Sequence, residues 1–156
     1  MHIRLIAVGD RQSTWVDAAF DDYVARLPRQ WQFRLDTIAT AKRHKSSPVD
    51  TAIQAESEKI LARTKPADHV VVLDERGKQF SSRELAGKLD DWQAVGENLV
   101  FVIGGPDGVS GTLKERANTR WSLSKLTLPH GLARVLFAEQ IYRAWSLSAG
   151  HPYHRE

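Results

Sequence analysis

The clearest structural signal in the chain lies at Val100-Phe-Val-Ile-Gly-Gly-Pro-Asp-Gly108. Its first four residues are apolar without interruption, which is typical of a strand buried on both faces of a parallel sheet. The five residues that follow favour a tight turn, because glycine adopts positive φ at no steric cost and proline fixes its own φ. Glycines also leave the backbone open to a ligand. The turn is therefore either a plain connection or part of a binding site.

Outward from this strand, the apolar periodicity alternates between two and about 3.6 residues, as expected when strands and helices alternate. We expect strands at 3–8, 31–35, 69–74, 98–103 and 121–128, and helices at 13–27, 47–64, from 81, from 110 and at 132–147. Ser13 and Ser47 are expected as N-cap residues, and Ser81 with Glu84 as a capping box. Because three of the strands are apolar throughout, this order predicts one α/β domain over residues 1–156, with a mainly parallel sheet covered by helices on both faces.

The helix predicted at 132–147 is apolar over more than one face. Its apolar residues are Leu132, Val135, Leu136, Phe137, Ala138, Ile141, Tyr142, Ala144 and Trp145. A helix with so wide an apolar arc needs burial on two sides. The second side belongs either to another copy of the chain, which predicts a homodimer, or to the same subunit if the helix lies centrally.

Composition excludes several classes of protein. The 156 residues suffice for one domain with its own core. The chain has no cysteine, which excludes disulfides, thiolate catalysis and cysteine-ligated zinc and fits a reducing compartment. No apolar run approaches the roughly 18 residues of a membrane span, and the first residues lack the layout of a signal peptide. We therefore expect a cytoplasmic protein without a membrane partner.

Charge is distributed unevenly along the chain. The net charge is +3, but residues 111–156 carry seven Lys or Arg against three Glu. Such an asymmetry favours an anionic partner, with RNA or DNA as the usual candidates. A basic segment, Lys42-Arg-His-Lys45, either contacts phosphates or is a solvated loop. Tyr153 can stack on a base and Arg155 offers a planar cation, which makes RNA the better hypothesis.

Other kinds of site fit the sequence less well. Parallel sheets bind ligands beyond the carboxyl ends of their strands, but neither glycine motif that cradles di- or triphosphates occurs there. Asp10 and Asp74 follow strands as the acids of phosphoacceptor receiver domains do. The second acid and the lysine of that site are missing, so we interpret both as solvated turn residues. His130, His151 and His154 could converge on a metal, but no nearby paired carboxylates support them, so no metal site is predicted.

Three segments carry a resemblance to a known family. They are Ile103-Gly-Gly-Pro-Asp-Gly108, Trp121-Ser-Leu-Ser-Lys-Leu-Thr-Leu-Pro-His130 and the terminal His151-Pro-Tyr-His-Arg-Glu156. Together with the helix between the last two, they resemble the SPOUT methyltransferases. Within that family the resemblance is to the enzymes that methylate N3 of a pseudouridine in large-subunit ribosomal RNA. It implies a deep trefoil knot in the C-terminal part of the α/β fold, and a homodimer.

The resemblance also implies S-adenosyl-L-methionine as the cofactor, bound in a bent shape in the knot loops. Its contacts would be Leu73, Gly104, Gly105, Leu123, Ser124, Lys125, Leu126, Thr127 and Leu128. A side chain at either glycine would then collide with the cofactor. Lys125 stands where a small or apolar residue is expected, so we expect its side chain to point outward.

The substrate implied is pseudouridine 1915 in helix 69 of 23S rRNA, methylated in the assembled 70S ribosome. The roles expected are His154 or Glu139 as general base, Tyr153 to stack on or orient the flipped base, Arg155 and Arg134 to hold phosphate or the developing anion, and His130 to contact the base or fix the tail. The tail follows a helix expected at the dimer interface, so it is expected to reach the partner's cofactor. The alternative is a knot-fold RNA-binding protein without catalysis.

Overall fold

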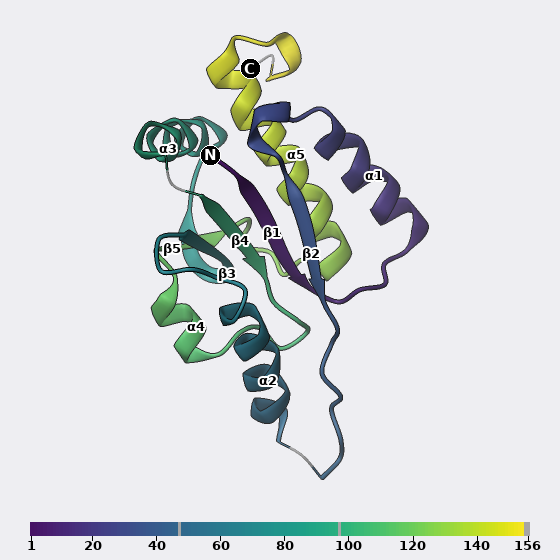
Figure 1. The fold of residues 1–156 in the computed structure, drawn as a ribbon. Coiled ribbons are helices and arrows are strands. Elements are labelled where there is room, and N and C mark those ends of the chain that lie inside the picture. Colours follow the sequence, from purple (N-terminus) through teal and green to yellow (C-terminus); the bar gives the residue numbers. More distant parts are fainter. Residues whose placement is uncertain (47, 97, 155–156) are drawn as a thin grey trace.

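The computed structural model describes residues 1–46, 48–96 and 98–154. Within these residues, five parallel strands form one sheet in the order β2-β1-β4-β3-β5 (Figure 1). The strands are β1 (Ile3–Val8), β2 (Arg34–Ile38), β3 (His69–Gln79), β4 (Leu99–Ile103) and β5 (Thr119–Ser122). The predicted parallel α/β sheet is confirmed.

Helices cover both faces of the sheet. They are α1 (Thr14–Ala25), α2 (Val49–Leu61), α3 (Ser82–Val95), α4 (Gly111–Arg116) and α5 (His130–Ala149), with short 3₁₀ helices at Arg29–Trp31 and Pro152–His154. Residues of α1, α3 and α5 belong to the apolar core on one face, and residues of α2 and α4 to the core on the other. Figure 1 shows α5 between α1 and α3.

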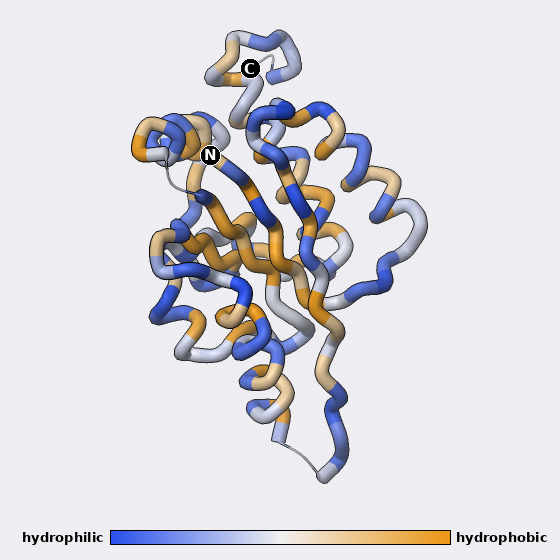
Figure 2. Tube along the Cα trace, viewed as in Figure 1, coloured by the Kyte–Doolittle hydropathy of each residue, from blue (hydrophilic) through white to orange (hydrophobic). Residues whose placement is uncertain are grey.

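The central strands are apolar because they are buried on both sides. All five residues of β4 are buried, and hydrophobic colour follows the strands through the middle of the molecule (Figure 2). Phe101 faces α5, where its ring centroid lies 4.9 Å from that of Phe137. Val102 belongs to the opposite core, with Ile60 of α2 and Leu113 of α4. Removing the Phe101 ring should cost about 3–5 kcal/mol, as for other large core side chains.

The strand order distinguishes this fold from a receiver domain. Receiver domains share the order 2-1-3-4-5, whereas here β4 lies between β1 and β3. From β4 the chain crosses by α4 to β5 at the far edge of the sheet, and then returns on the opposite face as α5. The receiver alternative is therefore wrong. The path is consistent with the trefoil knot expected of the fold class.

Several predicted boundaries were wrong for local reasons. The predicted strand at 121–128 ends at Ser122, because the Ser122 hydroxyl donates to the Ser124 carbonyl and the Ser124 hydroxyl accepts from the Leu126 amide. Such local side-chain bonds compete with the ladder. The predicted strand at 31–35 begins only at Arg34, after a 3₁₀ turn that contains Trp31. α5 begins at His130, two residues before the predicted start at Leu132.

β3 and the helix starts show similar differences of detail. β3 continues to Gln79, with a bulge between Leu73 and Lys78. The capping box of Ser81 and Glu84 is confirmed. Ser13 occupies the N-cap position of α1, but its side chain makes no capping hydrogen bond. The expected cap Ser47 lies outside the described residues.

α5 packs against both α1 and α3. Its wide apolar arc is thus largely satisfied within one subunit, as the second of the two interpretations above requires. Leu132, near the start of the helix, remains 44% exposed. Among the helices of the described part, none combines the length and apolar character needed to cross a membrane.

Candidate active site

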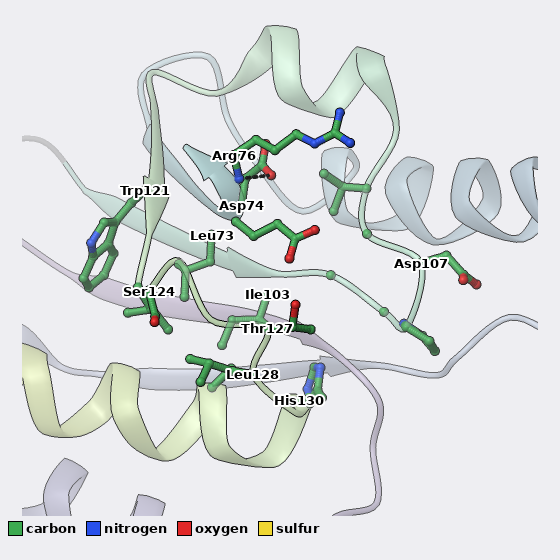
Figure 3. Close-up of a pocket in the computed structure, with 18 of the residues that line it drawn as sticks. Leu73, Asp74, Arg76, Ile103, Asp107, Trp121, Ser124, Thr127, Leu128 and His130 are labelled. Carbon is green, nitrogen blue, oxygen red and sulfur yellow. Dashed lines mark hydrogen bonds between the residues drawn. The ribbon is translucent and has the colours of Figure 1, made fainter. Parts of the chain in front are cut away.

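A cavity of about 650 Å³ opens beyond the carboxyl ends of β3, β4 and β5 (Figure 3). Its walls are the bulge after Leu73, the turn that follows β4, the segment between β5 and α5, and the start of α5. The lining residues are Leu73–Arg76, Ile103–Val109, Lys114, Trp121, Leu123, Ser124, Leu126–Leu128, His130 and Ala133. This is where open parallel sheets place their ligands.

The glycines of the turn are required by the packing of the protein itself. A Cβ on Gly104 would lie 2.7 Å from Val109 Cγ1, and one on Gly105 would lie 2.8 Å from Glu56 Oε1. Gly108 has φ +86, and its amide donates to the Gly105 carbonyl at 3.1 Å. We expected the glycines to make room for a cofactor. The structure supplies a further reason, the close approach of neighbouring protein atoms.

The residues predicted to bind a cofactor gather in this cavity. Leu73, Gly104, Gly105, Leu123, Ser124, Leu126, Thr127 and Leu128 all line it. Lys125 is exposed and is not among the lining residues, in keeping with an outward-pointing side chain. Figure 3 shows Leu73, Ile103 and Leu128 close together, with Asp74 and Arg76 on the opposite side from His130.

Asp74 is a site residue that the sequence analysis misjudged. Its side chain is only 10% exposed, so it is not a solvated turn residue. Oδ1 accepts from the Arg76 amide at 3.0 Å, whereas Oδ2 is buried without a hydrogen-bond partner among the described residues. The nearest cation, Lys114 Nζ, is 3.9 Å away. A buried acceptor facing a cavity is suited to a ligand donor. The sequence signal that points to Asp74 as a site residue is its position directly after Leu73, which was itself predicted to contact the cofactor.

His130 and Arg134 stand together at the start of α5. Arg134 is 2% exposed and donates to the Gly9 carbonyl and, at 2.9 Å, from Nε to His130 Nε2. Burial and the charge of Arg134 lower the pKa of His130, although a hydrogen bond with the Gly104 backbone opposes this. Neutral His130 therefore carries its proton on Nδ1. The sequence resemblance predicts that Arg134 holds phosphate or the developing anion. In the structure its guanidinium is buried and holds His130 in place.

The tail lies at the other end of α5. The Tyr153 hydroxyl donates to Glu139 Oε1 at 3.1 Å and lies 3.3 Å from the Tyr23 hydroxyl. The Tyr153 ring centroid lies 4.6 Å from that of Tyr142. Burial, with the Tyr23 hydrogen bond and the Glu139 carboxylate, raises the pKa of Tyr153 well above its usual range. His154 Nδ1 is buried without a hydrogen-bond partner among the described residues.

The predicted catalytic residues thus fall into two groups. His130 lines the cavity and accepts a hydrogen bond from Arg134, whereas Tyr153 and His154 follow the C-terminal end of the 20-residue α5. At roughly 1.5 Å per residue, the two ends of α5 are about 30 Å apart. Glu139 belongs to the tail group through its bond to Tyr153. Arg155 lies outside the described residues. Within residues 1–46, 48–96 and 98–154, no group of three or more His, Asp or Glu side chains could hold a metal ion.

A model of the family described as predicted SPOUT methyltransferases matches residues 1–154. The chain belongs to the SPOUT methyltransferase family. It is 46% identical over 156 residues to the ribosomal RNA large subunit methyltransferase H of Thioalkalivibrio sulfidiphilus, covering all of both chains. It is 47% identical over 156 residues to that of Laribacter hongkongensis, again over both full lengths.

Solved structures match the chain at the level of the fold. A probable rRNA-methyltransferase from Porphyromonas gingivalis superimposes with a TM-score of 0.57 at 12% identity, over 94% of this chain and 69% of that one. A probable methylase family protein from Haemophilus influenzae gives a TM-score of 0.55 at 13% identity, over 97% and 69%.

SPOUT membership implies a methyl donor of the S-adenosylmethionine type, and the cavity fits one. Its volume is within the roughly 300–1,000 Å³ of small-molecule sites. Leu73, Ile103 and Leu128 offer apolar surface for an aromatic base. Asp74 Oδ2 offers a buried acceptor for a hydroxyl or ammonium donor. The turn that begins at Gly104 leaves backbone groups accessible beside them.

Proposed function

We propose that this chain transfers the methyl group of S-adenosyl-L-methionine to N3 of pseudouridine 1915 in helix 69 of 23S rRNA, in the assembled cytoplasmic 70S ribosome. The observation that carries the proposal is the cavity at the carboxyl edge of the sheet. The residues predicted to bind the methyl donor line it. The full-length similarity to proteins named for large-subunit ribosomal RNA methylation supports the choice of substrate. An RNA-binding protein without catalysis would have no need of such a cavity.

S-adenosylmethionine supplies a methyl group attached to a positively charged sulfonium. The cavity residues would hold the donor, and Asp74 would accept a hydrogen bond from one of its hydroxyl or ammonium groups. Holding two reactants in line removes much of the entropic barrier to their reaction. We therefore assign most of the rate to positioning by the three irregular segments and by α5.

The ring nitrogen N3 must lose its proton when it takes the methyl group. We assign this proton to His154 and not to Glu139, because the Glu139 carboxylate is already hydrogen-bonded within the subunit. Glu139 already accepts from Arg143 at 2.6 Å and from the Tyr153 hydroxyl. Tyr153 stays protonated because its pKa is raised, so it orients the base by stacking or donation. A general base of this kind contributes about 10²- to 10⁴-fold.

The separation of tail and cavity requires a second subunit if the tail takes part in catalysis. The Tyr153 hydroxyl reaches back along α5 to Glu139, which is nine residues, or about 14 Å of helix, from His130. No described residue of the tail lines the cavity of its own subunit. In a homodimer whose α5 helices run in opposite directions, each tail comes to the partner's cavity. We therefore propose composite sites, with His154 and Tyr153 acting on substrate held at the other subunit's donor.

A transfer assay with labelled S-adenosylmethionine tests the proposal. Ribosomes that lack the modification are offered as 70S particles and as free 50S subunits. We expect label in N3-methylpseudouridine, and more of it in 70S particles. Binding of S-adenosylmethionine without methyl transfer would indicate that the chain methylates another RNA. Absence of donor binding would overturn the methyltransferase assignment.

Mixing two defective variants tests the composite site. One variant lacks residues 151–156, and the other carries Asp74→Arg in the cavity. If tails act across the dimer, some mixed dimers regain one complete site and the mixture becomes active. If each tail acts within its own subunit, the mixture stays as inactive as its components.

A further inference from the structure

The basic segment 42–45 divides into side chains that face outward and one that is held against the protein. Lys42, His44 and Lys45 are exposed. Arg43 is only 22% exposed, and its guanidinium contacts two carboxylates that are distant in sequence, Glu56 and Asp107. Arg43 is thus neither a free phosphate contact nor part of a solvated loop.

Glu56 is the buried centre of these contacts. It lies on α2 with 1% exposure, and its carboxylate accepts from Arg43 Nη1 at 2.6 Å and Nη2 at 3.2 Å. The Ala41 amide donates to it at 2.9 Å, and Arg43 Nη1 donates back to the Ala41 carbonyl at 2.8 Å. A buried carboxylate is stable only when it is paired and hydrogen-bonded, and Arg43 provides both.

The same contacts reach the turn that lines the cavity. Arg43 Nε donates to Asp107 Oδ2 at 2.9 Å. Glu56 Oε1 packs so closely on Gly105 that a Cβ there would be 2.8 Å away. The next residue of α2, Ser57, is also 1% exposed, and its hydroxyl accepts from the Ser110 amide at 2.9 Å. Both ends of the segment that lines the cavity are therefore held by buried polar groups of α2.

We propose that Arg43 is a positioning residue for the turn 104–108, acting through Glu56 and Asp107 to hold the backbone that contacts the methyl donor. Arg43 does not line the cavity, whereas Gly105 and Asp107 do. The identity of the ligand rests on the proposed function, but the positioning of the turn does not. If Arg43 only stabilised the fold, its loss would lower stability without loosening the turn in particular.

Arg4 provides a matched control. Its side chain is 24% exposed, its guanidinium lies 3.4 Å from Asp36 and 3.5 Å from Asp68, and it donates to the Arg63 carbonyl at 2.8 Å. It sits in β1 near the amino ends of the strands, at the opposite edge from the cavity. Arg4→Gln and Arg43→Gln therefore remove similar contacts from different places.

Two measurements on the full chain test the proposal. The first is calorimetric binding of S-adenosylhomocysteine, a donor product that cannot react. We expect Arg43→Gln to weaken binding about tenfold, Arg43→Lys to recover part of this, and Arg4→Gln to leave it unchanged. Asp107→Asn should weaken binding too, and the double variant with Arg43→Gln should bind no worse than the weaker single variant.

The second measurement is hydrogen exchange of the backbone amides in the turn and in Ser110. Exchange there should increase in Arg43→Gln more than in Arg4→Gln at equal global stability. Unchanged binding together with unchanged exchange would overturn the positioning role. If the natural chain binds no S-adenosylhomocysteine, the proposed donor is wrong, and exchange in the turn still decides the role of Arg43.

Discussion

The two ends of α5 differ in what each one lacks. At His130 the helix meets an open cavity walled by irregular backbone, with a buried acceptor on Asp74. At the other end, Tyr153 packs into a cluster of rings with Tyr23 and Tyr142. That cluster has titratable groups, and its residues do not line the cavity at His130. In the proposed composite site, each end supplies one half, and a second subunit brings the halves together.

Deleting residues 151–156 gives the strongest test of this comparison. We expect methyl transfer to fall by about 10²- to 10⁴-fold, the usual contribution of a general base. Binding of S-adenosylhomocysteine should change little, because the tail is remote from the cavity of its own subunit. Single-turnover transfer and calorimetry measure the two quantities. A shortened chain that still methylates at the full rate would show that the tail is not part of the site.

Gly104→Ala tests the opposite end of α5. The new Cβ would lie 2.7 Å from Val109 Cγ1 and 3.1 Å from the Gly108 backbone, so the turn must shift. We expect donor affinity to fall by about tenfold, a change of about 1.4 kcal/mol, with the contacts of the tail unaffected. Gly87→Ala in α3 is the control, since nothing lies within 4 Å of its Cβ. That change should stabilise the helix by roughly 0.5–1 kcal/mol. Equal donor affinity in the two variants would contradict the prediction.

Arg134→Met should affect stability at the cavity end. It leaves the Gly9 carbonyl and His130 Nε2 without their donor inside the protein. An unsatisfied buried acceptor costs about 1–3 kcal/mol. Urea denaturation should therefore give a lower free energy of unfolding than for Arg120→Met, an exposed change expected to stay within about 0.5 kcal/mol. Similar values for both variants would argue against a positioning role for Arg134.

The smallest expected effect is a dependence of stability on pH that originates at His130. Its pKa is lowered in the folded protein, so the unfolded chain takes up the proton first as the pH falls below about 6.5. The contribution is fully present above that pH and is lost as the pH falls toward the folded-state pKa. Urea unfolding of the natural chain and of His130→Gln, at about pH 7.5 and about pH 5, measures the difference. If His130→Gln loses as much stability on acidification, the effect comes from other groups.

Local signals predicted the elements that depend on local interactions. The Val100–Ile103 run was identified as a buried strand because all its residues are apolar, and Ser81 with Glu84 marked the start of α3 because a capping box is formed within one turn. The segment Leu123–Leu128 has the same apolar character as a strand, yet hydrogen bonds of Ser122 and Ser124 and the lack of a partner beyond the sheet edge leave it irregular. The segment lines the cavity as expected, but its apolar residues wrongly predicted a strand.

The alternation of strands and helices and the glycine turn after β4 follow from periodicity and from local motifs. The set of residues that gather at the cavity was implied by the family resemblance of those motifs. The tertiary structure decided the strand order, the inward turn of Arg43, the burial of Asp74 and the distance between tail and cavity. Each of these depends on which segments far apart in sequence come into contact, as when residue 43 meets residues 56 and 107. Burial and pairing are set by such contacts, and no local pattern encodes them.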